Sequence, residues 1–320
     1  MIEVDQHRPS GRTYAGAQLR AIAMPMGGIG TGQVALCGDG GLRQWQLFNQ
    51  ANHKAFVPDS FFVVRAGDSD TPFGGITRIL QSETALALAQ LETPMVNDEL
   101  VPDQQRALIE RFGGVRDTEF TAAYPFAQIA YQDEALPVDI SLEAFSPFIP
   151  LSSTDSSIPS VIFTFTLRNP GHRVISGALG AALKNAVGWD TVTPIDGNAC
   201  ALFGGNVNSV VSAEAYTAIV MENPTLAWND PGRGQMILST DNDDPVVMSS
   251  WADAGEFVGA LDRFDLAATP VTAAPDLSVR PTIQRMRERA QRELDRSALS
   301  RPSAPGFTVN GGLAILRTGA

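Results

Sequence analysis

One segment of this sequence carries the alternation of a β-strand through nine consecutive residues. In PSVIFTFTLRNP (Pro159–Pro170), the side chains of Val161, Phe163, Phe165 and Leu167 fall on one face of an extended backbone. The residues between them fall on the other face, as a period of two requires. An Asn-Pro-Gly turn follows directly and ends the strand. The segment therefore predicts a strand whose aromatic face is buried in a sheet.

Further strands are predicted along the chain, and the segments between them are rich in Gly, Asn, Asp and Pro. Many short strands with such turns favour an antiparallel sandwich over a fold built from alternating strands and helices. We therefore expect a mainly β fold, a large antiparallel β-sandwich of two packed sheets with a few peripheral helices. The additional predicted strands are Pro137–Phe148, Val174–Asn185, Ala199–Phe203, Ala215–Met221, Gly234–Ser239 and Gly311–Leu316.

Two segments have the pattern of helices. Pro102–Phe112 begins with proline in the first turn and is followed by two glycines, which are the usual start and stop residues of a helix. In Thr282–Ala298, apolar residues recur at helical spacing. The second segment predicts a surface helix packed on the sandwich, as an insertion at about residues 276–299 between strands.

The composition disfavours several classes of partner. The chain has 320 residues, 44% of them hydrophobic and 18% charged, with a net charge of −12. This acidic balance disfavours nucleic acid and anionic membrane surfaces, and no apolar run approaches the roughly 18 residues of a membrane span. Cys37 and Cys200 lie far apart in the sequence. Two buried thiols in a reducing cytosol are favoured over one disulfide, and a cytoplasmic location is expected.

A glycine-rich segment admits two interpretations. Gly27, Gly28, Gly30 and Gly32 lie within six residues. Their spacing suggests a phosphate loop, but the residue that follows is Gln33, where that motif needs a lysine for the β- and γ-phosphates. We favour structural glycines, which permit positive φ and let the backbone pass close to a neighbouring element or domain. A second turn, at Asp39 and Gly40, fits a tight hairpin.

The residues after this hairpin include candidates for sugar binding. Trp45, Asn49, Asn52 and His53 combine an aromatic ring, which stacks on pyranose faces, with amides that bind hydroxyls. Core packing of Trp45, with the asparagines as caps, is the favoured alternative. The histidine and cysteine spacings fit no metal site, and no nucleophile motif is present. No cofactor is expected.

Several segments, in order, resemble the amino-terminal domain of glycoside hydrolase family 116. This is the family of the non-lysosomal glucosylceramidase and its bacterial β-glucosidase relatives. The strongest resemblances are IAMPMGGIGTGQVALCGDGGLRQWQLFNQANH (Ile22–His53) and SPFIPLSSTDSSIP within Ala144–Pro170. The supporting segments are Ser60–Arg65, Lys184 and Asn185 with Gly188 and Trp189, Trp251 with Phe257, Gly259 and Leu261, and Gly306–Gly319. Trp189 thereby joins the candidates for a sugar site or a domain interface.

The resemblance implies that two domains have separate roles. In that family the amino-terminal half is a β-sandwich, and a carboxy-terminal (α/α)6 domain supplies a nucleophile glutamate and an acid/base aspartate. This chain has no positions that match either carboxylate, so we expect no catalytic residue in it and no activity alone. Residues 1–320 are expected to form a single domain that lacks the closing strand, which leaves an unpaired edge near Gly311–Leu316 and favours self-association.

The expected partner is the catalytic (α/α)6 domain, in cis or in trans. A β-glycoside substrate is expected to bind through that domain. The family suggests β-glucosides cleaved with retention. Two other hypotheses remain open: a stand-alone carbohydrate-binding or scaffolding module without catalysis, and an enzyme built on the sandwich itself. A retaining glycosidase needs two carboxyl groups about 5–5.5 Å apart, and no such pair is apparent in the sequence.

Overall fold

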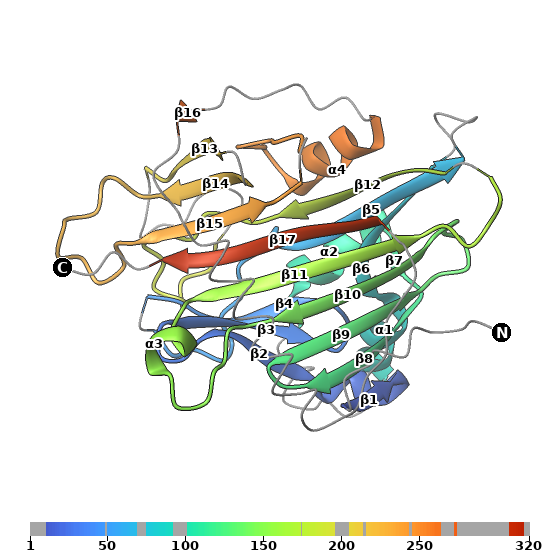
Figure 1. Cartoon of the computed structure of the whole chain (residues 1–320), viewed down its shortest axis with the longest axis horizontal. Coiled ribbons are helices and arrows are strands. Elements are labelled where there is room, and N and C mark those ends of the chain that lie inside the picture. The colour runs from blue at the N-terminus through green and yellow to red at the C-terminus, as the bar shows by residue number, and fades with distance from the viewer. Residues whose placement is uncertain are drawn as a thin grey trace.

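The fold is a β-sandwich in which one ten-stranded sheet faces two smaller sheets (Figure 1). It is seen in a computed structural model that describes residues 11–48, 50–68, 75–91, 101–173, 175–195, 205–213, 216–242, 245–263, 272–273 and 307–316. The mainly β, antiparallel architecture predicted from the sequence is confirmed. The layer opposite the large sheet is divided between two sheets.

The large sheet is antiparallel throughout, except for its last pair. Its spatial order is β1 (Arg12–Ala15), β8 (Asp117–Ala123), β9 (Phe126–Gln132), β10 (Asp139–Phe145), β11 (Ser160–Arg168), β17 (Phe307–Leu316), β15 (Gln235–Thr240), β14 (Tyr216–Glu222), β13 (Val207–Ala213) and β16 (Thr272–Ala273). Within the described strands of this sheet, only β13 and β16 pair in parallel. The strand predicted from the alternating aromatic segment is β11, near the centre of this sheet.

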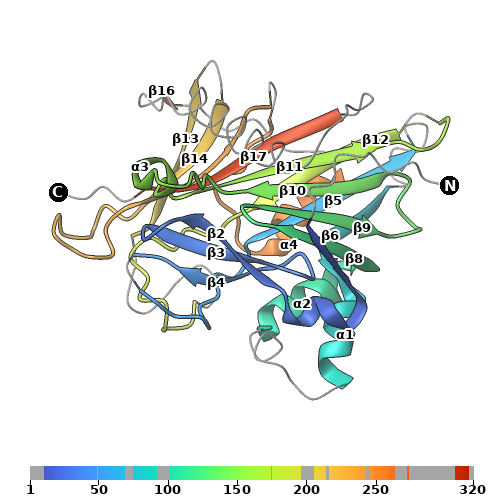
Figure 2. The ribbon, with the colours of Figure 1, turned by 60° about the horizontal axis from the view of Figure 1, so that its bottom comes forward.

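The opposite layer consists of a four-stranded and a three-stranded sheet. The first contains β12 (Ile175–Ala182), β5 (Phe61–Asp68), β6 (Ile76–Ser82) and β7 (Gly114–Val115). The second is formed by β2 (Ala23–Gly28), β3 (Gly32–Cys37) and β4 (Leu42–Gln46). Figure 2 shows both on the same side of the large sheet.

Apolar side chains of all three sheets fill the space between the layers. Phe62 of β5 packs edge-on against both Phe163 and Phe165 of β11, with 4.9 Å between ring centroids in each case. Trp45 and Leu36 of the three-stranded sheet belong to the same buried cluster. The alternation of β11 therefore directs its aromatic face into this core, as the sequence predicts.

Helices cover the outer face of the four-stranded sheet, so this part of the molecule has three layers. They are α1 (Glu83–Leu91), α2 (Asp103–Phe112) and α4 (Ala254–Arg263). Ile109 of α2 and Val258 of α4 pack with Phe61 and Ile79 in a second buried cluster. Helix α2 confirms the predicted 102–112 helix, whereas α1 and α4 were not predicted. A 3-10 helix (Gly16–Ala21) and the short α3 (Ser153–Ser156) complete the described helices.

Strand β17 contradicts one expectation from the sequence. An unpaired edge was predicted near Gly311–Leu316, but β17 pairs antiparallel with β11 on one side and with β15 on the other. The predicted unpaired edge is wrong, because this strand lies inside the large sheet. The self-association argued from it stays a prediction. The predicted strand 199–203 and the helical insertion at 276–299 lie outside the described residues.

Candidate functional site

One end of the sandwich gathers the long connections between strands. Strands β8, β10 and β14 run in the same direction through the antiparallel sheet, so the connections after them (124–125, 146–159 and 223–234) lie at one end. The β2–β3 turn meets them there, because the Ile29 N–H donates to the Ser156 carbonyl at 2.8 Å. We call these four connections, with the described parts of the β12–β13 connection, the loop end. In Figure 1 it lies at the left, with α3.

The glycine segment forms the β2–β3 turn of the loop end. Gly27, Gly30 and Gly32 have φ values of 138°, 71° and 123°, a region that side chains other than glycine rarely adopt. The Thr31 N–H donates to the Gly28 carbonyl at 3.3 Å and closes the turn. The glycines therefore shape a tight turn between two strands.

This turn is wedged against the β10–β11 connection. A Cβ atom added at Gly28 would lie 2.5 Å from the Ser157 carbonyl oxygen. The Gly27 N–H donates to the Ser146 hydroxyl at 2.7 Å, and the Thr31 hydroxyl donates to the Ser157 carbonyl at 2.7 Å. Two of the backbone N–H groups that a phosphate cradle would use, those of Gly27 and Ile29, are thus engaged within the chain.

The candidate sugar-binding residues do not converge on one surface. Trp45 is fully buried, and its indole N–H donates to the Leu42 carbonyl at 3.3 Å. Trp189 is 3% exposed and donates to the Thr193 carbonyl at 2.7 Å. Both rings belong to the main core, so neither offers a face to a sugar.

Among the polar candidates, Asn52 has a structural role. Its amide donates to the Thr191 carbonyl at 2.6 Å, and its side-chain oxygen accepts the Lys54 N–H at 3.0 Å. Asn52 thus links the β4–β5 connection to the β12–β13 connection. His53 is exposed. Asn49 lies outside the described residues.

Four asparagines, none of them predicted as site residues, tie further connections of the loop end together. Asn206 donates to the Asn185 side-chain oxygen at 2.9 Å, and Asn185 donates to that of Asn208 at 2.9 Å. Asn223 donates to the Asn206 side-chain oxygen at 2.8 Å. These amides join the β12–β13 connection, β13 and the β14–β15 connection, which fixes the loops relative to one another.

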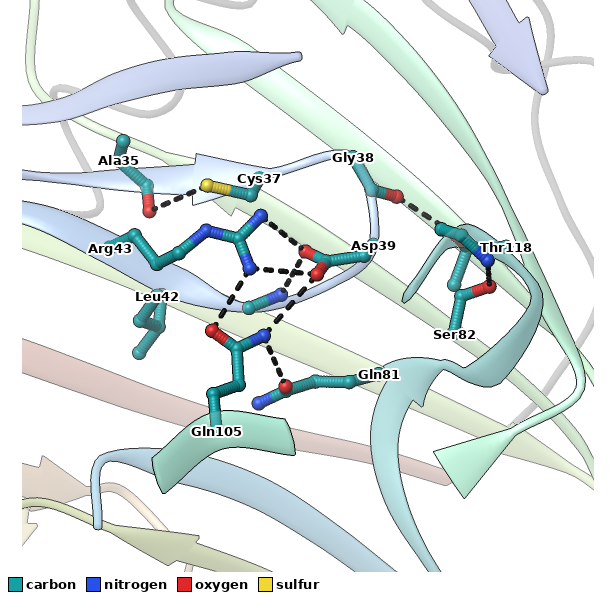
Figure 3. Close-up of polar contacts among 12 residues, drawn as sticks. Ala35, Cys37, Gly38, Asp39, Leu42, Arg43, Gln81, Ser82, Gln105 and Thr118 are labelled. Atoms are coloured by element: carbon teal, nitrogen blue, oxygen red, sulfur yellow. Dashed lines mark hydrogen bonds and ion pairs between the residues drawn. The ribbon is translucent and has the colours of Figure 1, made fainter. Parts of the chain in front are cut away.

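A buried charged cluster lies away from the loop end, at the β3–β4 turn (Figure 3). Asp39 and Arg43 are 4% and 5% exposed, and Arg43 Nη1 lies 2.7 Å from Asp39 Oδ2. Arg43 Nη2 donates to the other carboxylate oxygen at 3.1 Å. That oxygen also accepts the Gly41 N–H at 2.9 Å, and Gln105 of α2 donates to Oδ2 at 3.2 Å. The carboxylate is thereby paired and fully hydrogen-bonded, as a buried charge requires.

The same turn of the three-stranded sheet is hydrogen-bonded to both of the other sheets. Gln105 donates to Gln81 of β6 at 2.7 Å, and the Ser82 N–H of β6 donates to the Asp39 carbonyl at 2.8 Å. Thr118 of β8, in the large sheet, donates its hydroxyl to the Gly38 carbonyl at 2.8 Å. The cluster therefore holds the three-stranded sheet in place.

Burial sets the protonation states around this cluster. Burial raises the pKa of the Cys37 thiol to about 11, so the thiol is neutral and unreactive near pH 7. Burial, with a smaller effect of Asp39, also raises the pKa of Tyr131. Burial alone would lower the pKa of Arg43, but Asp39 more than offsets this and keeps the guanidinium charged.

The sequence gives a faint signal for this cluster that our sequence analysis did not use. Asp39 and Arg43 lie four residues apart on either side of two glycines, and they are the only charged residues of the hairpin 32–46. Two opposite charges so placed indicate an internal ion pair across the turn. The contribution of Gln105, 62 residues further on than Arg43, has no signal in the sequence.

Two further kinds of feature, metal sites and membrane-spanning helices, are absent from the part of the chain that the structure describes. No group of three or more His, Cys, Asp or Glu side chains there is placed to hold a metal ion. No described helix is both long and apolar enough to cross a membrane.

The chain is a large β-sandwich whose connections are cross-linked at one end. In a comparison with known families, the model described as "beta-glucosidase 2, glycosyl-hydrolase family 116 N-term" matches residues 23–281. The chain therefore belongs to the glycoside hydrolase family 116 amino-terminal domain family. The match includes both the glycine turn and the β10–β11 connection, and it confirms the resemblance predicted from the sequence.

Proposed function

We propose that this chain is the accessory β-sandwich of a family 116 β-glycosidase, which supports and docks a catalytic domain. The observation that carries the proposal is the match of residues 23–281 to the amino-terminal domain of that family. The hydrogen bonds among the connections of the loop end, at 2.7–2.9 Å, support a scaffolding role. A surface fixed in advance loses little entropy when a partner binds.

In this proposal the chemistry belongs to the partner domain. The (α/α)6 domain supplies the nucleophile glutamate and the acid/base aspartate, and it binds the β-glycoside. The sandwich stabilises that domain and is inactive alone. We further propose a cytoplasmic location, for which the buried free thiol of Cys37 is weak support.

The rival function, a free carbohydrate-binding module, has less support. It relied on aromatic rings that could stack on a sugar, and two of the candidate rings, Trp45 and Trp189, are at most 3% exposed. Asn52 uses its amide group within the chain. Only His53 among the described candidates is exposed.

The test is reconstitution. The 320-residue chain is assayed with an aryl β-glucoside alone, and then with a separately expressed family 116 (α/α)6 domain from the same organism. We expect no turnover by the chain alone, and a stable complex with increased hydrolysis when both are present. Turnover by the chain alone that is lost on changing one of its carboxylates would refute the proposal. So would the absence of any complex.

A further inference from the structure

The loop end exposes large apolar side chains that a free surface rarely carries. Seven large apolar side chains stand out as exposed among the described residues, and Leu151 and Trp228 reach 108% and 75% exposure. Six of the seven lie in the loop end or at the residue where β13 begins beside it. These six are Ile29, Tyr124, Leu151, Val192, Val207 and Trp228.

Trp228 is presented on an ordered loop. In the β14–β15 connection, the Asp230 N–H donates to the Ala227 carbonyl at 3.0 Å and the Arg233 N–H donates to the Asp230 carbonyl at 3.0 Å. The Asp230 carboxylate accepts the Gly232 N–H at 2.8 Å. Two consecutive turns thus hold the indole outward at a small entropic cost. Tryptophan is one of the three residue types enriched among the side chains that dominate protein interfaces.

Leu151 and Ile29 belong to two connections that are bonded to each other. The Ile29 N–H and the Thr31 hydroxyl both donate to the β10–β11 connection, at 2.8 and 2.7 Å. The glycines of the β2–β3 turn allow this approach, because a side chain at Gly28 would collide with it. The two apolar side chains are therefore carried by one rigid unit.

The path of the chain indicates what covers this surface. Strand β17 runs antiparallel to β11, in the same direction as β10, and so it ends at the loop end. Figures 1 and 2 both show β17 ending on the side of the molecule where α3 lies. Any domain that follows β17 in a polypeptide begins at this end, next to the exposed apolar side chains.

We propose that the loop end is the surface on which the catalytic (α/α)6 domain packs, with Trp228 and Leu151 inserted into apolar pockets of that domain. This inference rests on the proposed function and specifies the face of the sandwich that performs it. The wedge between the β2–β3 turn and the β10–β11 connection then serves to hold Ile29 and Leu151 in position for the partner.

The experiment compares three variants of the full chain, Trp228→Ala, Leu151→Ser and His172→Ala. His172 is the control, because it is exposed in the turn after β11, at the opposite end of the sandwich. Binding to the separately expressed (α/α)6 domain is measured by calorimetry. We expect Trp228→Ala to weaken binding about 10- to 30-fold, Leu151→Ser to weaken it less, and His172→Ala to leave it unchanged. Circular dichroism and thermal unfolding verify that each variant is folded.

The outcomes separate this inference from the proposed function. If the wild-type chain binds the catalytic domain and both loop-end variants bind as well as wild type, the docking face is wrong while the proposed function stands. If the wild-type chain does not bind at all, both fail. If the wild-type chain dimerises and Trp228→Ala makes it monomeric without changing catalytic-domain binding, the surface belongs to a second copy and the inference is overturned.

Discussion

The two turns at the ends of β3 differ in burial and in what holds them in place. The β3–β4 turn, around Asp39, is buried and is bonded to α2, to β6 and to β8. The β2–β3 turn, around Gly30, lies at the surface and exposes Ile29. Charge fixes the first turn from within the fold, whereas glycine shapes the second so that it fits a neighbouring loop. One strand, β3, thus connects the buried turn that stabilises the fold to the exposed turn of the proposed docking surface.

The largest expected effect comes from breaking the buried turn. Arg43→Ala leaves the Asp39 carboxylate buried without its cation, which should lower the free energy of unfolding by about 3–5 kcal/mol. Urea unfolding measures this loss. The matched control is Arg116→Ala, because Arg116 pairs with Glu134 at 3.4 Å on the exposed surface and should contribute less than about 1 kcal/mol. Equal losses of unfolding free energy in both variants would show that the buried ion pair stabilises the fold no more than the exposed one.

The next effect is a loss of stability at high pH, which arises at the buried turn. Because burial raises the pKa of Cys37 from 9.0 to about 11, the folded state favours the neutral thiol. The resulting stability is fully present below pH 9 and is lost as the pH rises through 11, by roughly 2–3 kcal/mol. Urea unfolding at pH 8 and at pH 10.5 measures it, and Cys37→Ala should flatten the change. Tyr131→Phe should remove a further loss above pH 10, since the pKa of Tyr131 is also raised. An unchanged slope in Cys37→Ala would contradict the assignment.

A smaller effect is expected at the exposed turn. Gly28→Ala places a Cβ atom 2.5 Å from the Ser157 carbonyl oxygen and should cost about 1–3 kcal/mol through overpacking. Gly30→Ala is the control, because a Cβ atom there meets nothing within 4 Å. Its cost should be limited to the positive φ of 71°, about 1–2 kcal/mol. Thermal unfolding compares them. A larger loss in Gly30→Ala than in Gly28→Ala would show that backbone strain dominates this turn.

The smallest effect concerns Ile29 itself. Ile29→Ser should change the free energy of unfolding by less than about 0.5 kcal/mol, because more than half of the side chain is already exposed. The same variant should weaken catalytic-domain binding. Denaturant unfolding of the isolated chain, beside the binding assay, tests both statements. A large loss of unfolding free energy would show that Ile29 stabilises the fold, which would contradict its assignment to the interface.

Much of the fold follows from local sequence. The alternation in Ser160–Arg168, the Asp39 and Gly40 turn and the proline and glycine residues around Asp103–Phe112 all predict elements that the structure contains. These signals are local, because side-chain period and turn chemistry act over a few residues. Helix α4 escaped prediction: its glycines, at 255 and 259, weaken the helical signal, whereas packing on Phe61 favours the helix.

The candidate site was harder to predict, because it depends on contacts between distant segments. Trp45 and Asn52 have the side chains of a sugar site, yet the fold uses them for its core and for loop cross-links. Trp228 had no distinguishing pattern in the sequence. Its loop is recognised as part of one surface only when the order of the strands places it at the same end of the sandwich as Leu151 and the end of β17.

The central position of β17 has a consequence for how the protein is made. Strands β1, β8, β9, β10 and β11 form one half of the large sheet, and β15, β14, β13 and β16 form the other, with β17 joining them. The two halves therefore cannot become one sheet until residues 307–316 have left the ribosome. Pairings across about 150 residues, such as Phe163 with Gly311, also form slowly. Until β17 has been synthesised, the two halves have separate edges at β11 and β15.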